Sequence, residues 1–199
     1  HWINGETGKV TPFGKKDNGG DLVETAFLVQ GIICVHEYFK DENEEEKALA
    51  AKMDKLWKGV EWNWYTKGGE KVLYWHWSPT YGWEMNFPLQ GYKECLITYV
   101  LAASSPDYSI DSETYNKGWT RNGTYTTDRT KYGLPLYVKH NDAEEFGGPL
   151  FWSQYSYLGL DPRGLSDQYV KSYWDLNRNH VLIDYKYCVE NPLNYKGYS

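Results

Sequence analysis

Three acidic residues near the N-terminus, Asp17, Asp21 and Glu24, are close enough in the sequence to form a cluster of carboxylates. Asp21 and Glu24 also have the spacing of a capping box, in which an N-cap side chain and a Glu three residues later stabilise the start of a helix by about 0.5–2 kcal/mol. Asp17, beside Asn18-Gly19-Gly20, is also a typical turn residue. The spacing favours the structural interpretation for Asp21 and Glu24 and leaves a chemical role open.

Glu94 is a sharper candidate for catalysis. It follows Gly91-Tyr92 and precedes the apolar run Cys95-Leu96-Ile97, so we expect it in the first turns of a buried helix. Burial raises the pKa of a carboxyl group, which keeps a proton available near neutral pH, as a general acid requires. The alternative is an acid that stabilises the helix N-terminus through the helix dipole. The residues alone do not separate these two roles.

Cleavage of a glycosidic bond usually needs a second carboxylate, about 6.5–9.5 Å from the acid in an inverting enzyme. Other acids lie in polar or loop contexts, where we expect most of them to be solvated: Glu61, Glu84, Glu144 and Glu145. The scattered histidines are more typical of structural residues than of catalysts: His76, His140 and His180. The sequence shows no nucleophile elbow, phosphate loop, dinucleotide fingerprint or zinc-ligand spacing.

The composition favours an ordered domain with many aromatic side chains. Of the 199 residues, 41% are hydrophobic, and there are 10 Trp and 19 Tyr. Flat aromatic rings suit the apolar face of a sugar ring, although composition alone favours the simpler view that they fill a large core. The net charge of −6 argues against a nucleic-acid partner, because binding phosphates requires Lys and Arg.

The cysteines and the N-terminus add expectations about the environment of the chain. Cys34, Cys95 and Cys188 are odd in number and sit in apolar contexts, so we expect buried thiols and neither a disulfide pair nor a metal site. We find no apolar run that approaches the length of a membrane span, and we expect none. A start at His1 instead of Met is compatible with a leader that has been removed.

The elements that must position these acids are predicted to be mostly helices. Residues 21–39 and 90–103 are apolar on all sides, which is typical of buried helices. Residues 43–58 form a helix with a single apolar stripe and acids in its first turn. Alternation of wholly apolar and one-sided helices favours a toroid of inner and outer helices, an α/α barrel, over a plain helical bundle.

The remaining segments are shorter or irregular. The alternating tryptophans of residues 62–77 predict a β-hairpin around Gly68-Gly69. We expect further helices at 112–119, at 151–158 and from Ser166 to about Val189, the last ending before Asn191-Pro192. Two segments read as irregular: 1–20 and 121–150.

Three blocks of the sequence resemble the bacterial glycoamylase-like family, and are most similar to its Bacteroidetes endo-β-1,2-glucanases. The first block is Gly19-Gly20-Asp21-Leu22-Val23-Glu24-Thr25-Ala26-Phe27-Leu28, and the second runs from Gly91-Tyr92-Lys93-Glu94 to Ser104-Ser105-Pro106. The third comprises Phe151-Trp152, Tyr155-Ser156, Gly159-Leu160-Asp161-Pro162-Arg163, Asp167, Tyr187-Cys188 and Asn191-Pro192. The blocks span nearly the whole chain in the expected order.

The resemblance implies an (α/α)6 toroid, a six-hairpin barrel, of which residues 1–199 form the N-terminal part of a single catalytic domain with a small β-hairpin excursion. It implies endo-acting hydrolysis of β-1,2-glucan, with inversion and with neither metal nor organic cofactor. Glu94 then matches the general acid, and Asp17, Asp21 and Glu24 match cleft acids. The family often has Asn where this chain has Lys93, a departure that bears on branch and substrate.

Further expectations rest on the same resemblance. The general base lies beyond residue 199, the remainder of the polypeptide completes the barrel, and the protein is periplasmic or otherwise exported. Candidate sugar contacts, each of which is equally compatible with core packing, are Trp77, Trp83, Phe87, Trp152 and Tyr155. Two other functions stay open: a non-catalytic carbohydrate-binding protein, which would tolerate loss of Glu94, and a domain of a glucan synthase or phosphorylase, which would need a cationic phosphate pocket.

Overall fold

The computed structural model describes residues 1–143 and 145–197, so Glu144, predicted to be a solvated acid, lies outside the described residues. The protein is helix-rich with small two-stranded sheets. It divides into two compact units, the first formed by His1–Gln90 and Cys95–Trp119, the second by Gly91–Glu94 and Thr120–Ser199.

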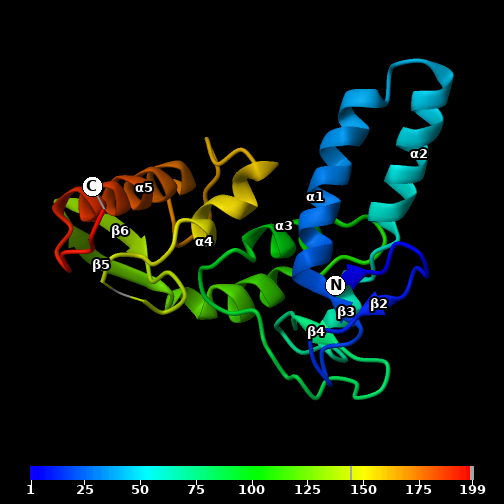
Figure 1. Cartoon of the computed structure of the whole chain (residues 1–199), viewed down its shortest axis with the longest axis horizontal. Coiled ribbons are helices and arrows are strands. Elements are labelled where there is room, and N and C mark those ends of the chain that lie inside the picture. Colours follow the sequence, from blue (N-terminus) through cyan, green and yellow to red (C-terminus); the bar gives the residue numbers. More distant parts are fainter. Residues whose placement is uncertain (144, 198–199) are drawn as a thin grey trace. The chain divides into compact units, whose positions relative to one another are not determined.

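The first unit is built on long helices and very short strands. Its helices are α1 (Leu22–Phe39), α2 (Glu44–Lys58) and α3 (Leu96–Ser104). Its strands form two antiparallel pairs: β1 (Trp2–Ile3) with β2 (Val10–Thr11), and β3 (Gly20–Asp21) with β4 (His76–Trp77). Figure 1 shows α1 and α2 running side by side, and α1 also packs against α3. The predictions of α1 and α2 are confirmed, with N-caps at Asp21 and Asn43.

Helix α1 is apolar on all sides, but only one side of it is buried. Leu22, Val23 and Ala26 lie in the core, whereas Leu28 is 64% exposed. The expectation that this helix is buried on most of its surface is therefore wrong within the residues that the structure describes. With 18 residues and a mean hydropathy of 1.3, α1 is also long and apolar enough to cross a membrane, by length and composition only, contrary to our sequence expectation. The core helix of a soluble protein passes the same test, and the absence of a span stays a prediction.

The β-hairpin predicted for residues 62–77 is wrong. Residues Trp62–Thr66 form a short 3-10 helix, η1, and β4 pairs with β3 instead. The burial pattern gives the reason, because Trp62 and Thr66 are buried while the intervening Trp64 is exposed, which does not match the period of a strand. Lys67 then ends η1 in the left-handed conformation.

Helix α3 starts later than predicted, and this moves Glu94 out of it. The helix begins at Leu96, after a bend at Gly91, whose φ is +74°, and a turn at residues 94–95. Buried Tyr99 fixes α3 to the preceding loops, accepting from Leu73 N at 3.0 Å and donating to the Leu89 carbonyl at 2.8 Å. The helix expected at 112–119 is largely a π-helix, η2 (Thr114–Trp119).

In the second unit a hairpin packs against the C-terminal helix. The hairpin consists of β5 (Thr126–Lys131) and β6 (Leu134–Val138), and α5 (Tyr173–Glu190) lies along it (Figure 1). Asn179 of α5 donates to the Pro135 carbonyl at 3.0 Å. We expected irregular structure here and missed the turn at Tyr132-Gly133, where both residues have positive φ.

The predicted helix at 151–158 is confirmed as α4 (Phe151–Gln154) followed by the 3-10 helix η4 (Tyr155–Leu158). A short 3-10 helix, η3 (Arg121–Gly123), precedes β5. Helix α5 starts at Tyr173 with Ser172 as its cap, so a start at Ser166 is wrong. Buried thiols are confirmed only for Cys95, because Cys34 is exposed and Cys188 is half-buried.

Candidate active site

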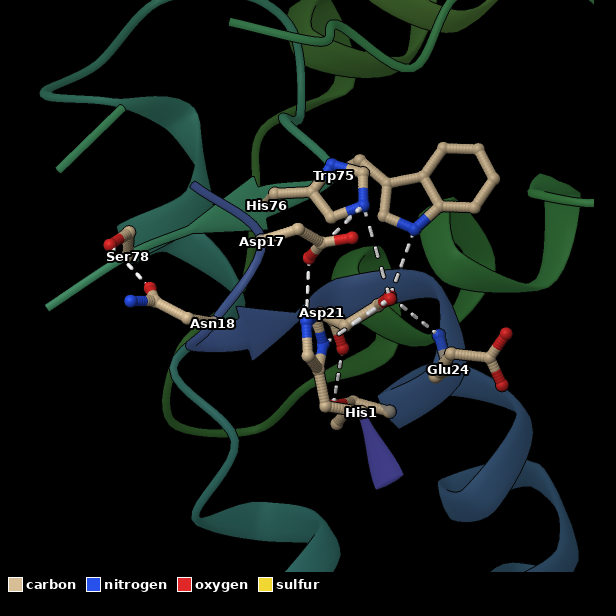
Figure 2. Close-up of polar contacts among 9 residues, drawn as sticks. His1, Asp17, Asn18, Asp21, Glu24, Trp75, His76 and Ser78 are labelled. Carbon is tan, nitrogen blue, oxygen red and sulfur yellow. Dashed lines mark hydrogen bonds and ion pairs between the residues drawn. The ribbon is translucent and has the colours of Figure 1, made fainter. Parts of the chain in front are cut away.

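Asp21 occupies the junction between β3 and α1. Its backbone pairs with His76 in the two-stranded ladder, and the next residue, Leu22, donates its N–H to the Trp75 carbonyl at 2.9 Å. Its carboxylate oxygen Oδ1 accepts from the Glu24 backbone N–H at 3.0 Å and from the Trp75 indole N–H at 2.9 Å (Figure 2). Asp21 is therefore the N-cap of α1, as the spacing predicted, and the same side chain faces a second, non-capping donor.

Two histidines bring Asp17 and Asp21 together. His1 Nε2 lies 2.5 Å from Asp17 Oδ1, and His1 Nδ1 lies 3.6 Å from Asp21 Oδ2. His76 Nε2 lies 3.9 Å and 4.0 Å from oxygens of the same two carboxylates. The Asp21 side chain is only 5% exposed and that of His1 only 1%. When protonated, the histidines compensate the charge of two crowded carboxylates.

Glu24 contributes its backbone to this group more than its carboxylate. Figure 2 shows the Glu24 carboxylate directed away from Asp17 and Asp21, and the residue is exposed. The predicted cluster of three acids is therefore a close pair, Asp17 and Asp21, with Glu24 beside it on the first turn of α1. His76 was interpreted as structural from the sequence, and only the pairing of β3 with β4 places it at the acids.

The adjacent glycines allow the two strands to meet. A Cβ on Gly19 would lie 2.4 Å from the Trp77 carbonyl oxygen, and a Cβ on Gly20 would lie 2.1 Å from the Tyr65 hydroxyl. Burial raises the pKa of Tyr65 to about 12, with a smaller contribution from the negative charge of Asp21. A neutral Tyr65 packed against Gly20 thus forms part of the support of the acid pair.

Aromatic side chains border the acid pair on the β4 side. Phe87 meets His76 edge to face, with ring centroids 6.3 Å apart, and Trp75 at 5.4 Å. Trp77 lies opposite Gly20 in the ladder and contacts Trp64. Phe87 therefore lies next to the acids, whereas Trp77, the strand neighbour of His76, faces the other side and contacts Trp64. Trp83 belongs to another aromatic group, with Trp64, Tyr65 and Tyr74.

Glu94 lies in the second unit, on a segment whose backbone is held at several points. The Ser156 hydroxyl donates to the Glu94 carbonyl at 2.8 Å. The preceding Tyr92 is buried, with its hydroxyl 2.7 Å from that of Tyr157, and its carbonyl accepts from Asn141 N–H at 2.6 Å. Glu94 is half-buried, two residues before α3 and not within it. The sequence predicted the helix at 151–158 but did not indicate that its Ser156 holds the Glu94 backbone.

A network of tyrosines around Asp167 supports Tyr92. The Tyr173 ring stacks on Tyr92 with an interplanar angle of 22°, and the Tyr173 hydroxyl donates to Asp167 Oδ2 at 2.7 Å. Tyr125 donates to the same oxygen at 3.3 Å, and the other Asp167 oxygen accepts from the Val170 N–H at 2.7 Å. Asp167 was part of the family-like pattern, and its contacts give it a structural role beneath the Glu94 segment.

The remaining predicted histidines are structural. His140 and His180 lie with their rings 4.1 Å apart, and burial lowers the pKa of both, that of His140 well below its usual value. The His180 Nε2 lies 2.8 Å from the Gly148 carbonyl, and its Nδ1 lies 2.6 Å from the Ser153 hydroxyl. Ser153 is fully buried. This Ser–His contact therefore stabilises the core and cannot reach a substrate.

The two sugar contacts predicted in the second unit lie on α4 and η4. Trp152 packs against Gly148, where a Cβ would lie 2.2 Å from the indole, and against Phe151. Tyr155 is 45% exposed and begins η4, next to the serine that bonds Glu94. Among residues 1–143 and 145–197, no group of three or more His, Cys, Asp or Glu side chains is arranged to hold a metal ion.

Comparison with known proteins places the chain in a family. A sequence model of the Glycoamylase family, described as "Putative glucoamylase", matches residues 86–199. A solved endo-β-1,2-glucanase from Chitinophaga pinensis, in complex with sophorotriose and glucose, is 59% identical, with a TM-score of 0.96 over 100% of this chain and 47% of that one. A solved β-1,2-glucanase from Parabacteroides distasonis is 43% identical, with a TM-score of 0.90 over 99% of this chain and 30% of that one.

A curated relative from Parabacteroides distasonis, an exo β-1,2-glucooligosaccharide sophorohydrolase (non-reducing end), is 43% identical over 217 residues, which cover 100% of this chain and 29% of that protein. The chain thus spans less than half the length of these relatives. The region that the family model matches includes Glu94, Ser156 and Asp167. The solved Chitinophaga pinensis enzyme matches the whole chain, and so also the segment that contains Asp17 and Asp21. The chain belongs to the glycoamylase family that its sequence motifs predicted.

Proposed function

We propose that this chain forms part of the active site of a glycoside hydrolase that cleaves β-1,2-glucan. The observation that carries the proposal is the 59% identity, over the whole chain, to an enzyme named for that reaction. The geometry supports it with a close pair of carboxylates, bordering aromatic rings and a half-buried glutamate on a constrained segment.

In this proposal Glu94 is the general acid. As the bond between the anomeric carbon and the glycosidic oxygen breaks, the Glu94 carboxyl gives its proton to the leaving oxygen, and water attacks the anomeric carbon from the opposite face. The water's proton passes to a general base, which the family resemblance places outside residues 1–199. A fixed backbone at Glu94, through the Ser156 hydrogen bond, favours a defined approach of the carboxyl to the oxygen.

Asp17 and Asp21 take the role of binding sugar hydroxyl groups. Carboxylate oxygens accept strong hydrogen bonds from hydroxyl donors, and the nearby His1 and His76 compensate their charge when protonated. Phe87, beside this pair, offers a face for the apolar side of a glucose ring. Trp77, which contacts Trp64, stays a predicted sugar contact. For Trp152 and Tyr155 we propose contact with sugar bound near Glu94, supported by the place of η4 next to the Glu94 carbonyl.

We further propose that the whole protein folds as an (α/α)6 toroid, completed by the rest of the polypeptide. The exposed apolar side of α1 supports this, because Leu28, Val35 and Tyr38 are 37–74% exposed and would be covered by neighbouring helices of a closed barrel. We propose a periplasmic or exported location on the family resemblance alone. Endo action is favoured over exo action by the higher identity to the endo-acting relative.

The test is hydrolysis by the full-length protein of linear β-1,2-glucan, β-1,3-glucan and starch, with released oligosaccharides separated by size. We expect β-1,2-glucan alone to be cut, into a range of short oligomers, and Glu94→Gln to lose at least about a hundredfold in rate. Glu84→Gln is the matched control, because Glu84 is an exposed acid paired only at the surface with Lys16. Cleavage of starch instead, or full activity of Glu94→Gln, would contradict the proposal.

A further inference from the structure

The first unit contains an open groove that the acid pair does not line. Its volume is about 810 Å³, and its walls include Glu61, Asn63, Trp64, Lys67, Trp83 and Tyr108. Ligand sites in proteins typically measure about 300–1,000 Å³. We propose that this groove is a second glucan-binding site that holds a distant part of a long chain, an inference that rests on the proposed function.

The walls of the groove offer two flat aromatic surfaces. Trp64 and Trp83 have ring centroids 6.2 Å apart and planes tilted by 42°. Trp64 is 52% exposed, which is unusual for the largest apolar side chain and marks a surface that gains from being covered. Trp83 is held in place by Tyr65 and Tyr74. A tilted pair of this kind suits the apolar faces of successive sugar rings.

The local backbone explains why Trp64 faces outward. In the 3-10 helix η1, Trp62 and Thr66 turn into the core, so Asn63 and Trp64 face solvent. Lys67, the C-cap of the helix, is followed by Gly68 and Gly69, and all three have positive φ. A non-glycine residue in this conformation costs about 1–3 kcal/mol, and such positions gather at ligand sites. The Thr66 hydroxyl accepts from the Gly69 N–H at 3.1 Å, which fixes the turn.

The polar groups at the rim fit a neutral, hydroxyl-rich ligand. Glu61 and Asn63 are exposed on one side. Lys67 is held by Asn86 at 2.9 Å and lies 4.8 Å from the centre of the Tyr74 ring. One acid and one base give the groove little net charge, which disfavours phosphate or nucleic-acid ligands. Aromatic faces with carboxylate, amide and ammonium groups at their edge are the chemistry that recognises a glucan chain.

A second site has a defined consequence for long substrates. A chain that is held in the groove reaches the acids as an intramolecular ligand, so its effective concentration rises without any new contact at the acids. Short oligosaccharides, which cannot occupy both places, gain nothing. The proposal therefore predicts that the groove affects binding of the polymer and not of the trisaccharide.

The test compares binding of long linear β-1,2-glucan and of sophorotriose to the full-length protein, in the Glu94→Gln background so that neither is consumed. We expect Trp64→Ala to weaken polymer binding about tenfold, which corresponds to about 1.4 kcal/mol, and to leave sophorotriose binding within about twofold. Trp64→Phe keeps a flat ring and should retain most of the affinity. Trp174→Ala, which removes a tryptophan of similar exposure from α5, is the control and should change neither.

The outcomes distinguish the groove from the proposed function. If polymer binding is unchanged in Trp64→Ala while the native protein cleaves β-1,2-glucan, the second site is wrong and the proposed function stands. If Trp64→Ala loses affinity equally for polymer and for sophorotriose, Trp64 belongs to the sugar-binding site at the acids, and the proposal of a separate site is wrong. If the native protein neither binds nor cleaves β-1,2-glucan, the proposed function fails and the groove proposal fails with it.

Discussion

Asp21 combines a structural and a chemical role, and two substitutions separate them. Asp21→Ala removes the cap of α1 and the acceptor of the Trp75 indole N–H. Loss of an N-cap costs about 0.5–2 kcal/mol, and leaving the part-buried Trp75 donor unsatisfied costs at most about 1–3 kcal/mol. We therefore expect the free energy of unfolding to fall by about 2–4 kcal/mol. Asp21→Asn keeps a capping oxygen of the same shape, and should cost less than about 1 kcal/mol.

The activities of the two Asp21 variants should not follow their stabilities. Asn lacks the negative charge that we assign to hydroxyl binding, so Asp21→Asn should lose most glucan hydrolysis although it folds normally. Urea unfolding and kcat/KM on β-1,2-glucan are the measurements. Asn43→Ala is the control, because Asn43 caps α2 by accepting from Glu45 and Glu46 and has no proposed contact with sugar. Its stability should fall by about 1 kcal/mol with activity intact.

Either of two results would refute this account of Asp21. Full hydrolysis by Asp21→Asn would show that the charge is not needed and that capping is the whole role. A loss of stability in Asp21→Asn as large as in Asp21→Ala would show that the charge near His1 and His76, and not the hydrogen-bond acceptor, stabilises the start of α1.

Three further predictions concern stability. Gly20→Ala places a Cβ 2.1 Å from the Tyr65 hydroxyl and should lower the free energy of unfolding by about 1–3 kcal/mol, measured in urea, and unchanged stability would contradict the packing described for β3. The depressed pKa values of His140 and His180 mean that the unfolded chain binds more protons, so their contribution to stability should be lost as the pH falls below about 6.5. Asp184 has the opposite effect on the pH dependence of stability. Burial raises its pKa to about 6, so below that pH the folded state binds a proton more tightly than the unfolded chain does. Asp184→Asn should therefore steepen the acid loss of stability, measured by urea unfolding between pH 4.5 and 7.5, and a shallower loss would contradict this assignment.

The sequence predicted best the features that neighbouring residues determine, such as the start of a helix. Asp21 and Asn43 are good caps followed by helix-forming runs, and both helices start at the next residue. The failed hairpin at residues 62–77 shows the limit of such patterns, because alternating tryptophans matched a strand while burial of Trp62 and Thr66 required a helical turn. The pairing of β4 with β3 joins residues more than fifty positions apart, which no local pattern contains.

For the candidate site, too, the sequence predicted individual residues but not their long-range contacts. Asp17, Asp21 and Glu94 were found from acid types in apolar or turn contexts together with a family-like pattern. Their partners were not, because the contacts of His76 with the acids and of Ser156 with the Glu94 carbonyl depend on how distant segments pack. The exposed half of α1 could not be predicted either, since an apolar helix gives no sign of which side is covered.

The most direct test of Glu94 as the proton donor varies the leaving group. The full-length native protein and Glu94→Gln would be compared on β-1,2-glucan and on an activated aryl glycoside of a β-1,2-gluco-oligosaccharide, whose phenolate leaves without a proton. We predict a loss of at least about a hundredfold in kcat/KM on the glucan and a much smaller loss on the activated glycoside. Equal losses on both substrates, or no loss on the glucan, would contradict a role for Glu94 as general acid.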